Sequence, residues 1–366
     1  MASKNIKNLN PAVCIHPGEH LKDELEARRI KQKDFASEIG IAHTQLNEII
    51  NGKRSITPDF ALLLEASIGI QAQDWLNLQS CYNLEKSRVL DSNIVKVTLI
   101  ETWNEVKKYV PISYFKKLGY ITGKPDEDVG IIKEIYGVDD IYKIRGLIER
   151  PQLVKYRKSN KLNVELVNLV AYVKLVEFKS KKIKVNNFDK SRKNALIQNL
   201  KKVFIDINVI ENTRLTLSEF GIKLITEDKP EKAPVDAIAF WSDSNPAIAV
   251  TLRFKRIDNF VFNIFHELGH IFEEHLEKEN GKPIIDDLDD STIGSIEEAQ
   301  ADNFAKENLI PSSIWSSFIA NNNFDDNAIK DFANTVRVPA AIVRGRLCFE
   351  ELLSYKSRTS ISYALS

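Results

Sequence analysis

Cysteine is scarce in this sequence. Only three cysteines, Cys14, Cys81 and Cys348, occur among the 366 residues, and no two of them form a C-x-x-C pair. An odd number of widely spaced cysteines excludes a disulfide framework and a thiolate zinc site as the basis of the fold. We therefore expect a protein of the reducing cytoplasm.

Long apolar segments are also missing. No apolar run approaches the roughly 20 residues that cross a bilayer, and the opening stretch MASKNIKNLNPAVC lacks the apolar centre of a signal peptide. With 43% hydrophobic and 28% charged residues, the chain has the composition of a globular protein rather than a disordered one. We expect no membrane partner, and the length leaves room for two or three domains.

Neither charge is in excess, with 51 basic and 51 acidic residues, but the charges are unevenly distributed. Residues 1–90 carry 11 of each sign, residues 91–205 carry 24 basic and 13 acidic side chains, and residues 206–366 carry 16 basic and 27 acidic ones. A basic middle and an acidic C-terminal third favour either nucleic acid binding near the middle or attraction between these two parts. Two solvated surfaces would give the same pattern.

Hydrophobic periodicity indicates a multidomain, mainly α protein with a small β-sheet. We predict an all-α helix-turn-helix domain over residues 1–90, a basic helical connecting region over 91–205 and an α+β domain over 206–366. In the last part, the runs GIKLITE, DAIAFW and PAIAVTLRF are β-branched or aromatic and are separated by turn formers, as in a small sheet. A helix should follow, with Asp258 as its N-cap.

The stretch QKDFASEIGIAHTQLNEII predicts two helices joined by a tight turn. Gly40 can adopt the positive φ that such a turn requires, and the apolar Leu46 and Ile49 would seat the second helix on the first. The outward face of the second helix offers hydrogen-bonding groups for base edges, namely His43, Thr44, Gln45 and Asn47. Basic side chains for phosphate contacts are Lys33, Lys53 and Arg54. A plain helical hairpin with a polar face would show the same pattern.

The segment NIFHELGHIFEEH, residues 263–275, places two histidines four residues apart. On a helix, His266 and His270 share one face and can offer two imidazole nitrogens to one metal ion. Glu267 lies beside them as a candidate general base. A hydrogen-bonded histidine pair in a helical core is the simpler alternative.

A catalytic zinc ion also needs a third protein ligand and one open position. In IEEAQADNFAKENLIP, Glu298 and Asp302 are four residues apart, so Glu298 could be the third ligand and Asp302 could accept the N–H of a ligand histidine. Glu297 is the competing ligand, but it points about 100° away from the Asp302 side of a helix. A solvated helix start would equally explain the acidic pair.

Both ends of the chain resemble known families. The stretch from HPGEHLKDELEARRI to QAQDWLNLQ, which includes NGKR, resembles the Cro/C1-type helix-turn-helix domain of the HigA antitoxin family. HELGH and the later EEAQADNFAKENLIP resemble the zincin-type ImmA/IrrE metallopeptidases, whose preceding strands are similar to GIKLITE and the two runs after it. That family's pattern has a glutamate where this chain has Gln300, which leaves Glu298 as the matching acid.

The resemblance implies a homodimeric repressor that binds double-stranded operator DNA, followed by a zincin-like domain that holds Zn²⁺. Our leading hypothesis is an antitoxin-like transcriptional regulator whose zinc-dependent peptidase cleaves itself or a partner repressor. In a second hypothesis, the zincin-like domain is the non-catalytic scaffold of a HigA-type antitoxin that neutralises a cognate toxin. In a third, the protein is a peptidase whose helix-turn-helix domain recruits protein partners.

Overall fold

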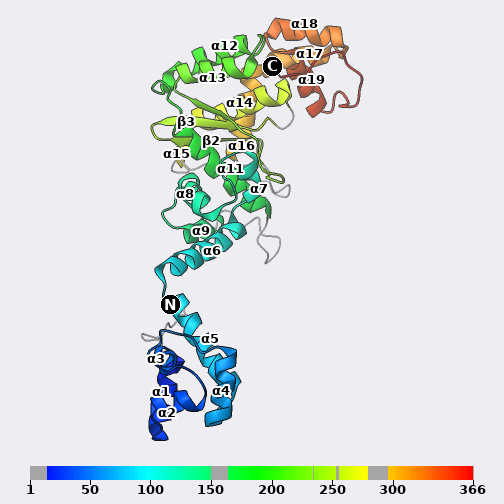
Figure 1. Ribbon diagram of the computed structural model, residues 1–366. Helices are drawn as coiled ribbons and strands as arrows, with labels where there is room; N and C mark the ends of the chain where they lie inside the picture. Colours follow the sequence, from blue (N-terminus) through cyan, green and yellow to red (C-terminus); the bar gives the residue numbers. More distant parts are fainter. Residues whose placement is uncertain (1–14, 150–163, 234, 253–254, 279–295, 366) are drawn as a thin grey trace. The chain divides into compact units, whose positions relative to one another are not determined.

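The computed structural model describes residues 15–149, 164–233, 235–252, 255–278 and 296–365 (Figure 1). The chain divides into two compact units, residues 1–102 and residues 103–366. Helices dominate both units, and a single three-stranded sheet lies in the second among the described residues. The prediction of a mainly α protein with a small sheet and an N-terminal helix-turn-helix domain is therefore confirmed. Among the described helices, none combines the length and the apolar composition that crossing a lipid bilayer requires.

The N-terminal unit is built from short helices around one apolar core. They are α1 (Pro17–Ala27), α2 (Gln32–Glu38), α3 (His43–Ile50), α4 (Pro58–Ile68) and α5 (Ala72–Arg88). Helix α6 (Asp91–Tyr109) begins here and continues into the second unit. The core is apolar and includes Leu21, Leu25, Phe35, Leu46, Ile49, Phe60, Leu64 and Trp75. Thr57 starts α4 by accepting a hydrogen bond from the backbone N–H of Phe60 at 3.3 Å, as an N-cap should.

Gly40 provides the turn between α2 and α3. Its φ is +74°, as predicted, and the backbone N–H of Ile41 donates to the carbonyl of Ala36 at 3.0 Å. A side chain is strained in this left-handed conformation, so glycine is the natural residue at this point of the chain.

The second unit contains seventeen further described elements after α6. The first eight precede the sheet: α7 (Ile112–Lys117), α8 (Pro125–Tyr136), η2 (Ile141–Lys143), α9 (Ile144–Ile148), α11 (Val164–Ser180), η3 (Lys190–Arg192), α12 (Lys193–Val203) and α13 (Val209–Glu219). The strands are β1 (Lys223–Thr226), β2 (Ala237–Ser242) and β3 (Asn245–Val250). The last six are α14 (Ile257–Phe272), α15 (His275–Lys278), α16 (Ile296–Leu309), α17 (Ser312–Ala320), α18 (Asp326–Val336) and α19 (Ala340–Phe349).

The sheet has the order β1-β3-β2, and each strand lies in one of the three predicted runs or extends one residue beyond it. β1 pairs with β3 in parallel, with Lys223 opposite Ala247, and β2 pairs with β3 in antiparallel fashion. Alternate residues of β3 enter different cores: Ile248 and Val250 on one face, Ala247 and Ala249 on the other. The sheet is therefore buried on both faces, which requires helices on both.

Helices from either side of residue 206 cover this sheet. α11 packs on β1, and its apolar residues share a core with one face, while α12, α13 and α14 share the core of the other face (Figure 1). The boundary that we predicted at residues 205 and 206 therefore marks a change of element type inside one compact unit. The physical reason is that a small sheet buries both faces only by using helices from both parts of the chain.

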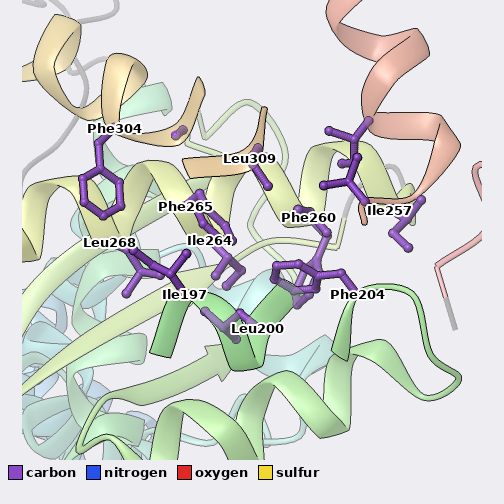
Figure 2. Packing of buried hydrophobic residues seen from close by; sticks show 14 of the residues in the cluster. Ile197, Leu200, Phe204, Ile257, Phe260, Ile264, Phe265, Leu268, Phe304 and Leu309 are labelled. Carbon is purple, nitrogen blue, oxygen red and sulfur yellow. The ribbon is translucent and has the colours of Figure 1, made fainter. Parts of the chain in front are cut away.

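Helix α14 is packed on several sides by apolar residues. Figure 2 shows Phe260, Ile264, Phe265 and Leu268 of α14 against side chains of other helices, namely Ile197 and Leu200 of α12, Phe204, and Phe304 and Leu309 of α16. The helix begins at Ile257 with Arg256 as the N-cap residue, so the predicted N-cap at Asp258 is wrong by two positions. Asp258 instead lies in the first helical turn, where its Oδ2 pairs with Nη2 of Arg256 at 2.7 Å.

Gly269 allows α14 and α16 to approach closely. A Cβ atom at this position would lie 2.8 Å from Cα and 3.1 Å from the carbonyl oxygen of Ala301. We expect Gly269→Ala to destabilise the second unit by about 1–3 kcal/mol, because the backbone of α16 must move away. Urea denaturation of the full chain followed by circular dichroism measures this change.

Gly130→Ala is the matched control, because a Cβ on that α8 residue meets no atom within 4 Å. We expect this control to be neutral or to stabilise the protein by up to about 1 kcal/mol. Equal stability of the two variants would mean that the α14–α16 contact does not depend on glycine.

Candidate metal centre and helix-turn-helix surface

Helix α3 presents a polar face in the N-terminal unit. His43, Thr44 and Asn47 are exposed and Gln45 is half-buried, whereas Leu46 and Ile49 are buried in the core. Lys33 on α2, together with Lys53 and Arg54 after α3, is also exposed. The structure therefore leaves these predicted DNA-contacting side chains accessible on or next to the two central helices.

Two residues that the sequence reading missed shape this surface. Asn51 donates through Nδ2 to both the backbone carbonyl and Oδ1 of Asn47, each at 2.7 Å. Glu48 accepts a hydrogen bond from Nε of Arg54 at 2.9 Å, so a phosphate would compete with a carboxylate for this guanidinium. The spacing of four between Asn47 and Asn51 was a signal available in the sequence.

Gly18 sets the distance between α1 and α3, and His16 sets the start of α1. A Cβ at Gly18 would lie 2.0 Å from the carbonyl oxygen of Ile49, so the helices meet at backbone distance. His16 is the N-cap residue of α1, and its Nδ1 accepts a hydrogen bond from the backbone N–H of Gly18 at 2.9 Å. The imidazole is buried and packs edge-on against Tyr82, with 4.7 Å between ring centroids.

The His16 cap makes the N-terminal unit sensitive to acid. Burial, reinforced by Lys86 and opposed by Glu19, lowers the pKa of His16 below its ordinary value of 6.5. The folded state thus favours neutral His16, so its stabilising contribution is present above pH 6.5 and is lost as the pH falls through the lowered pKa. Protonation removes the Nδ1 acceptor and with it a cap worth about 0.5–2 kcal/mol.

We expect α1 to exchange its amide hydrogens faster at pH 5 than at pH 7.5, after correction for intrinsic rates. Hydrogen–deuterium exchange of the full chain measures this difference. His16→Asn keeps a capping side chain that does not titrate and should lose the pH dependence. His20→Asn, at an exposed position of the same helix, should retain it, and a wild type without pH dependence would contradict the assignment.

In the second unit, three side chains converge beside α14. The Nε2 atoms of His266 and His270 lie 3.1 Å apart. Glu298 of α16 places Oε2 3.2 Å from Nε2 of His266 and Oε1 3.4 Å from Nε2 of His270. These three residues form a group whose potential ligand atoms all lie within 4.8 Å of one another. The spacing of four brings the histidines together locally, and the packing of α16 on α14 adds the carboxylate.

Asp302 orients the first histidine. Its Oδ1 lies 3.0 Å from Nδ1 of His266, one helical turn beyond Glu298 on α16. An ionised carboxylate only accepts hydrogen bonds, so Nδ1 of His266 carries the proton and Nε2 keeps its lone pair. His266 thus faces Glu298 and His270 with an acceptor nitrogen.

His275 orients the second histidine. Nδ1 of His270 lies 3.0 Å from Nδ1 of His275, and Nε2 of His275 lies 2.8 Å from Oε1 of Gln300. Because the Gln300 carbonyl oxygen accepts, His275 is protonated at Nε2 and accepts at Nδ1 from His270. The Nε2 atom of His270 therefore also keeps its lone pair.

From its place just after the helix of His266 and His270, the sequence indicates that His275 is a surface histidine or at most a donor to an oxyanion. The structure corrects this reading, since His275 is only 1% exposed and bonds to His270. Glu274, at φ +61°, turns the chain after α14 so that His275 folds back onto the helix it follows. Gln300 accepts the hydrogen bond from Nε2 of His275. It stands at the position where the resembling family has glutamate.

The electrostatics of the cluster favour a cation. Burial opposes ionisation of Glu298, but with protons on His266 and His270 their hydrogen bonds and positive charge outweigh it, so the pKa of Glu298 lies well below its usual range beside a cation. Two imidazole lone pairs and a carboxylate then meet at 3.1–3.4 Å. Such an arrangement of acceptors is repulsive unless a proton or a metal ion lies among them.

The donor set fits zinc. Two imidazole nitrogens and one carboxylate are a common ligand set of catalytic zinc sites, which keep one further position open. The His266 and Glu298 side chains are 12% and 20% exposed, so the cluster is reachable from solvent, whereas His270 is 1% exposed. Glu267, next to His266 on α14, is buried at 2% exposure.

Comparisons with known proteins concern the N-terminal part. Residues 21–75 match the helix-turn-helix family HTH_3. Virulence-associated protein I of Dichelobacter nodosus is 40% identical over 80 residues, which cover 22% of this chain and 72% of that protein. YddM, an uncharacterised HTH-type transcriptional regulator of Escherichia coli K12, is 31% identical over 71 residues, which cover 19% of this chain and 76% of that protein.

Two solved structures are also similar. An antidote protein of a plasmid maintenance system from Nostoc punctiforme is 36% identical, with 24% of this chain and 93% of that chain covered and a TM-score of 0.21. An addiction module antidote protein of the HigA family from Coxiella burnetii is 32% identical, with 26% of this chain and 95% of that chain covered and a TM-score of 0.20. These four comparisons thus cover between 19% and 26% of this chain.

Proposed function

The chain belongs to the helix-turn-helix family HTH_3 through its N-terminal unit, and on that premise we propose that it is an antitoxin-like transcriptional regulator carrying a zinc-dependent peptidase. The peptidase would cleave the chain itself or a partner repressor. The antitoxin-like part is supported by the resemblance of residues 16–79 to the HigA family. Double-stranded operator DNA, a second copy of the chain and a cognate toxin are the partners that this resemblance favours.

The exposed face of α3 supports DNA reading. Gln45 and Asn47 carry amides that can pair bidentately with adenine in the major groove, and Lys33 and Lys53 can contact phosphates. The N-terminal region has no net charge, with 11 basic and 11 acidic residues in the first 90. Affinity should therefore come from a few phosphate contacts and should fall only modestly with salt.

Substitution of Gln45 and Asn47 by alanine is expected to abolish discrimination between operator and scrambled DNA, at about 1–3 kcal/mol for each bidentate pair lost. Fluorescence anisotropy with DNA from upstream of the chain's own gene measures this. Lys33→Ala is the control, which should weaken binding to both DNAs equally and lower the salt slope by about one. If the double variant still distinguished operator from scrambled DNA, other residues would have to recognise the bases.

The single observation that carries the peptidase proposal is that Nε2 of His266 and Nε2 of His270 lie 3.1 Å apart and that each lies within 3.4 Å of one of the two Glu298 carboxylate oxygens. Both outer imidazole nitrogens are engaged by Asp302 and His275, which fixes the two inner lone pairs toward one point. These residues would hold the zinc ion, with the carboxylate offsetting part of its charge.

When bound, zinc polarises a carbonyl and makes water more acidic. Glu267 is the base available beside His266, and its carboxylate would take a proton from the attacking water and then deliver it to the leaving amine. The hydrogen bonds from His266 to Asp302 and from His270 to His275 hold both imidazoles in the ligand tautomer.

Gln300 supports a second candidate function. The resembling metallopeptidases have glutamate at this position, and the loss of that charge beside His275 is compatible with an antitoxin whose C-terminal unit is a non-catalytic scaffold. Metal content separates the two functions, since the scaffold needs no stoichiometric zinc. About one zinc per purified chain is expected for the peptidase.

The direct test incubates the purified full chain with the purified products of its neighbouring genes, with zinc and with a chelator. The peptidase proposal expects cleavage that the chelator stops and added zinc restores. Zinc-loaded protein that cleaves neither itself nor any of these proteins would favour the scaffold. Cleavage that resists the chelator would point to another protease.

A further inference from the structure

A cavity of about 540 Å³ lies in the second unit between α14, α16 and α19. This volume is within the range of about 300–1,000 Å³ that is typical of ligand pockets. Each of these helices lines the cavity with residues that lie on one of its faces. On α19, for example, Ile342, Arg346 and Phe349 follow one another at intervals of four and three residues. The cavity is therefore a feature of packed helices rather than of a loop.

The cavity adjoins the candidate metal centre. Asp302, which bonds to His266, is itself part of the cavity wall. Phe262 and Asn263 of α14 also line the cavity, four and three residues before His266 and so about 6 and about 4.5 Å from it along the helix axis. The ring centroids of Phe262 and His266 are 6.2 Å apart. A chain segment bound in the cavity would thus lie next to the metal centre.

Aromatic rings line the mouth of the cavity. Phe349 is 65% exposed and Tyr355 is 62% exposed. Phe349 is the only phenylalanine among the described residues that is exposed, since the others are buried or half-buried. Exposed aromatic surface rimmed by polar groups is typical of interaction sites. Leu309 and Ile342 continue the apolar wall inward.

The charged groups of the wall are largely paired with one another. Arg256 is bound by Asp258, and Arg346 donates to Glu350 and to the carbonyl of Ile310. Lys306 lies 3.9 Å from Asp302 and 5.4 Å from the centroid of the Phe349 ring. An anionic ligand would have to displace these pairs, so the wall favours an uncharged apolar group.

Asn259 and Asn263 add polar groups suited to a peptide. They are one turn apart on α14 and both line the cavity. Within the described part of the chain, neither side-chain amide makes a hydrogen bond. A carboxamide can both donate to a peptide carbonyl and accept from a peptide N–H. The cavity therefore combines an apolar wall with backbone-binding groups.

We infer that this cavity binds a large apolar, preferably aromatic, side chain of a peptide substrate, and holds the adjacent backbone against α14 next to the metal centre. This inference rests on the proposed peptidase function and names its substrate class. Phe349 and Tyr355 would close over the bound side chain. Asn259 and Asn263 would hold the backbone that leads toward His266.

Binding can be tested without catalysis. The probes are three blocked tripeptides, acetyl-Ala-X-Ala-amide with phenylalanine, glycine or glutamate at X, titrated into the full chain by ligand-observed NMR with and without zinc. Burial of an aromatic ring should make the phenylalanine peptide bind at least about 10-fold more tightly than the glycine peptide. The glutamate peptide should bind no better than the glycine one. Equal binding of the phenylalanine and glycine peptides would overturn the inference.

Phe349→Ala and Tyr355→Ala should each remove most of the preference for phenylalanine. Both side chains are mainly exposed, so neither change should affect folding. Tyr142→Ala is the matched control, because Tyr142 is 55% exposed in the same unit and does not line the cavity. A preference that survives both cavity variants, or that the control also removes, would contradict the assignment.

Cleavage of a peptide mixture by the zinc-loaded chain separates the two proposals. Cut sites read by mass spectrometry should be enriched in large apolar residues at one position, and Phe349→Ala should reduce that enrichment. Cleavage without side-chain preference would refute the cavity assignment and leave the peptidase intact. Phe349-dependent binding of the phenylalanine peptide without any cleavage would retain the cavity and refute the peptidase.

Discussion

Replacement of Glu267 by glutamine is expected to lower zinc-dependent peptide hydrolysis by about 10²–10⁴-fold, the usual contribution of a general base. Glutamine has nearly the same shape but cannot take a proton, so the buried position next to His266 should stay packed. Zinc content and operator binding should remain at wild-type levels. Initial rates on a cleaved partner protein, with zinc measured on the same samples, give the comparison.

Glu273→Gln is the matched control for this variant. Glu273 directly follows α14, is exposed and pairs with Lys193 at 3.5 Å. Exposed ion pairs contribute little, so we expect a near-normal rate. Unchanged hydrolysis in Glu267→Gln would exclude this carboxylate as the base, whereas loss of zinc from the variant would assign Glu267 a structural role instead.

Replacement of Glu298 by glutamine is expected to weaken zinc binding by more than about 100-fold. A neutral amide removes the carboxylate that faces both histidines at 3.2 and 3.4 Å. Even a residue that only orients a ligand, such as His275, typically changes metal affinity by about 10–100-fold. His275→Phe should therefore lie between Glu298→Gln and the wild type. Competition with a fluorescent zinc chelator measures all three dissociation constants.

Glu297→Gln provides the control for Glu298→Gln. The two glutamates are neighbours on α16, and only Glu298 belongs to the group of converging ligand atoms. Near-normal affinity is expected for Glu297→Gln. If its loss of affinity equalled or exceeded that of Glu298→Gln, the third ligand would have to be reassigned to position 297.

Local signals in the sequence were sufficient for several elements. The turn at Gly40, the burial of Leu46 and Ile49 and the exposure of His43 on α3 depend on neighbouring residues and on helical spacing. The same holds for the pairing of His266 with His270. These features were predictable because the forces that create them act within one or two helical turns.

The rest of the candidate site was harder to predict from the sequence. Spacing favoured Glu298 and Asp302 over Glu297, but their approach to the histidines needs the close packing of Gly269 on Ala301. The role of His275 was not predicted because it lies five positions after His270, and on a continuous helix that spacing does not keep two side chains on one face. The left-handed residue Glu274 interrupts the helix and folds His275 back.

By itself, the sequence determined the helix-turn-helix unit, the three strands and the paired histidines, because local periodicity and turn chemistry specify each of them. Only the tertiary structure decided that helices on both sides of position 206 cover one sheet and that His275 and Gln300 support His270. It also decided that a cavity opens beside Asp302. These features depend on contacts between residues far apart in the chain, whose pairing no local pattern encodes.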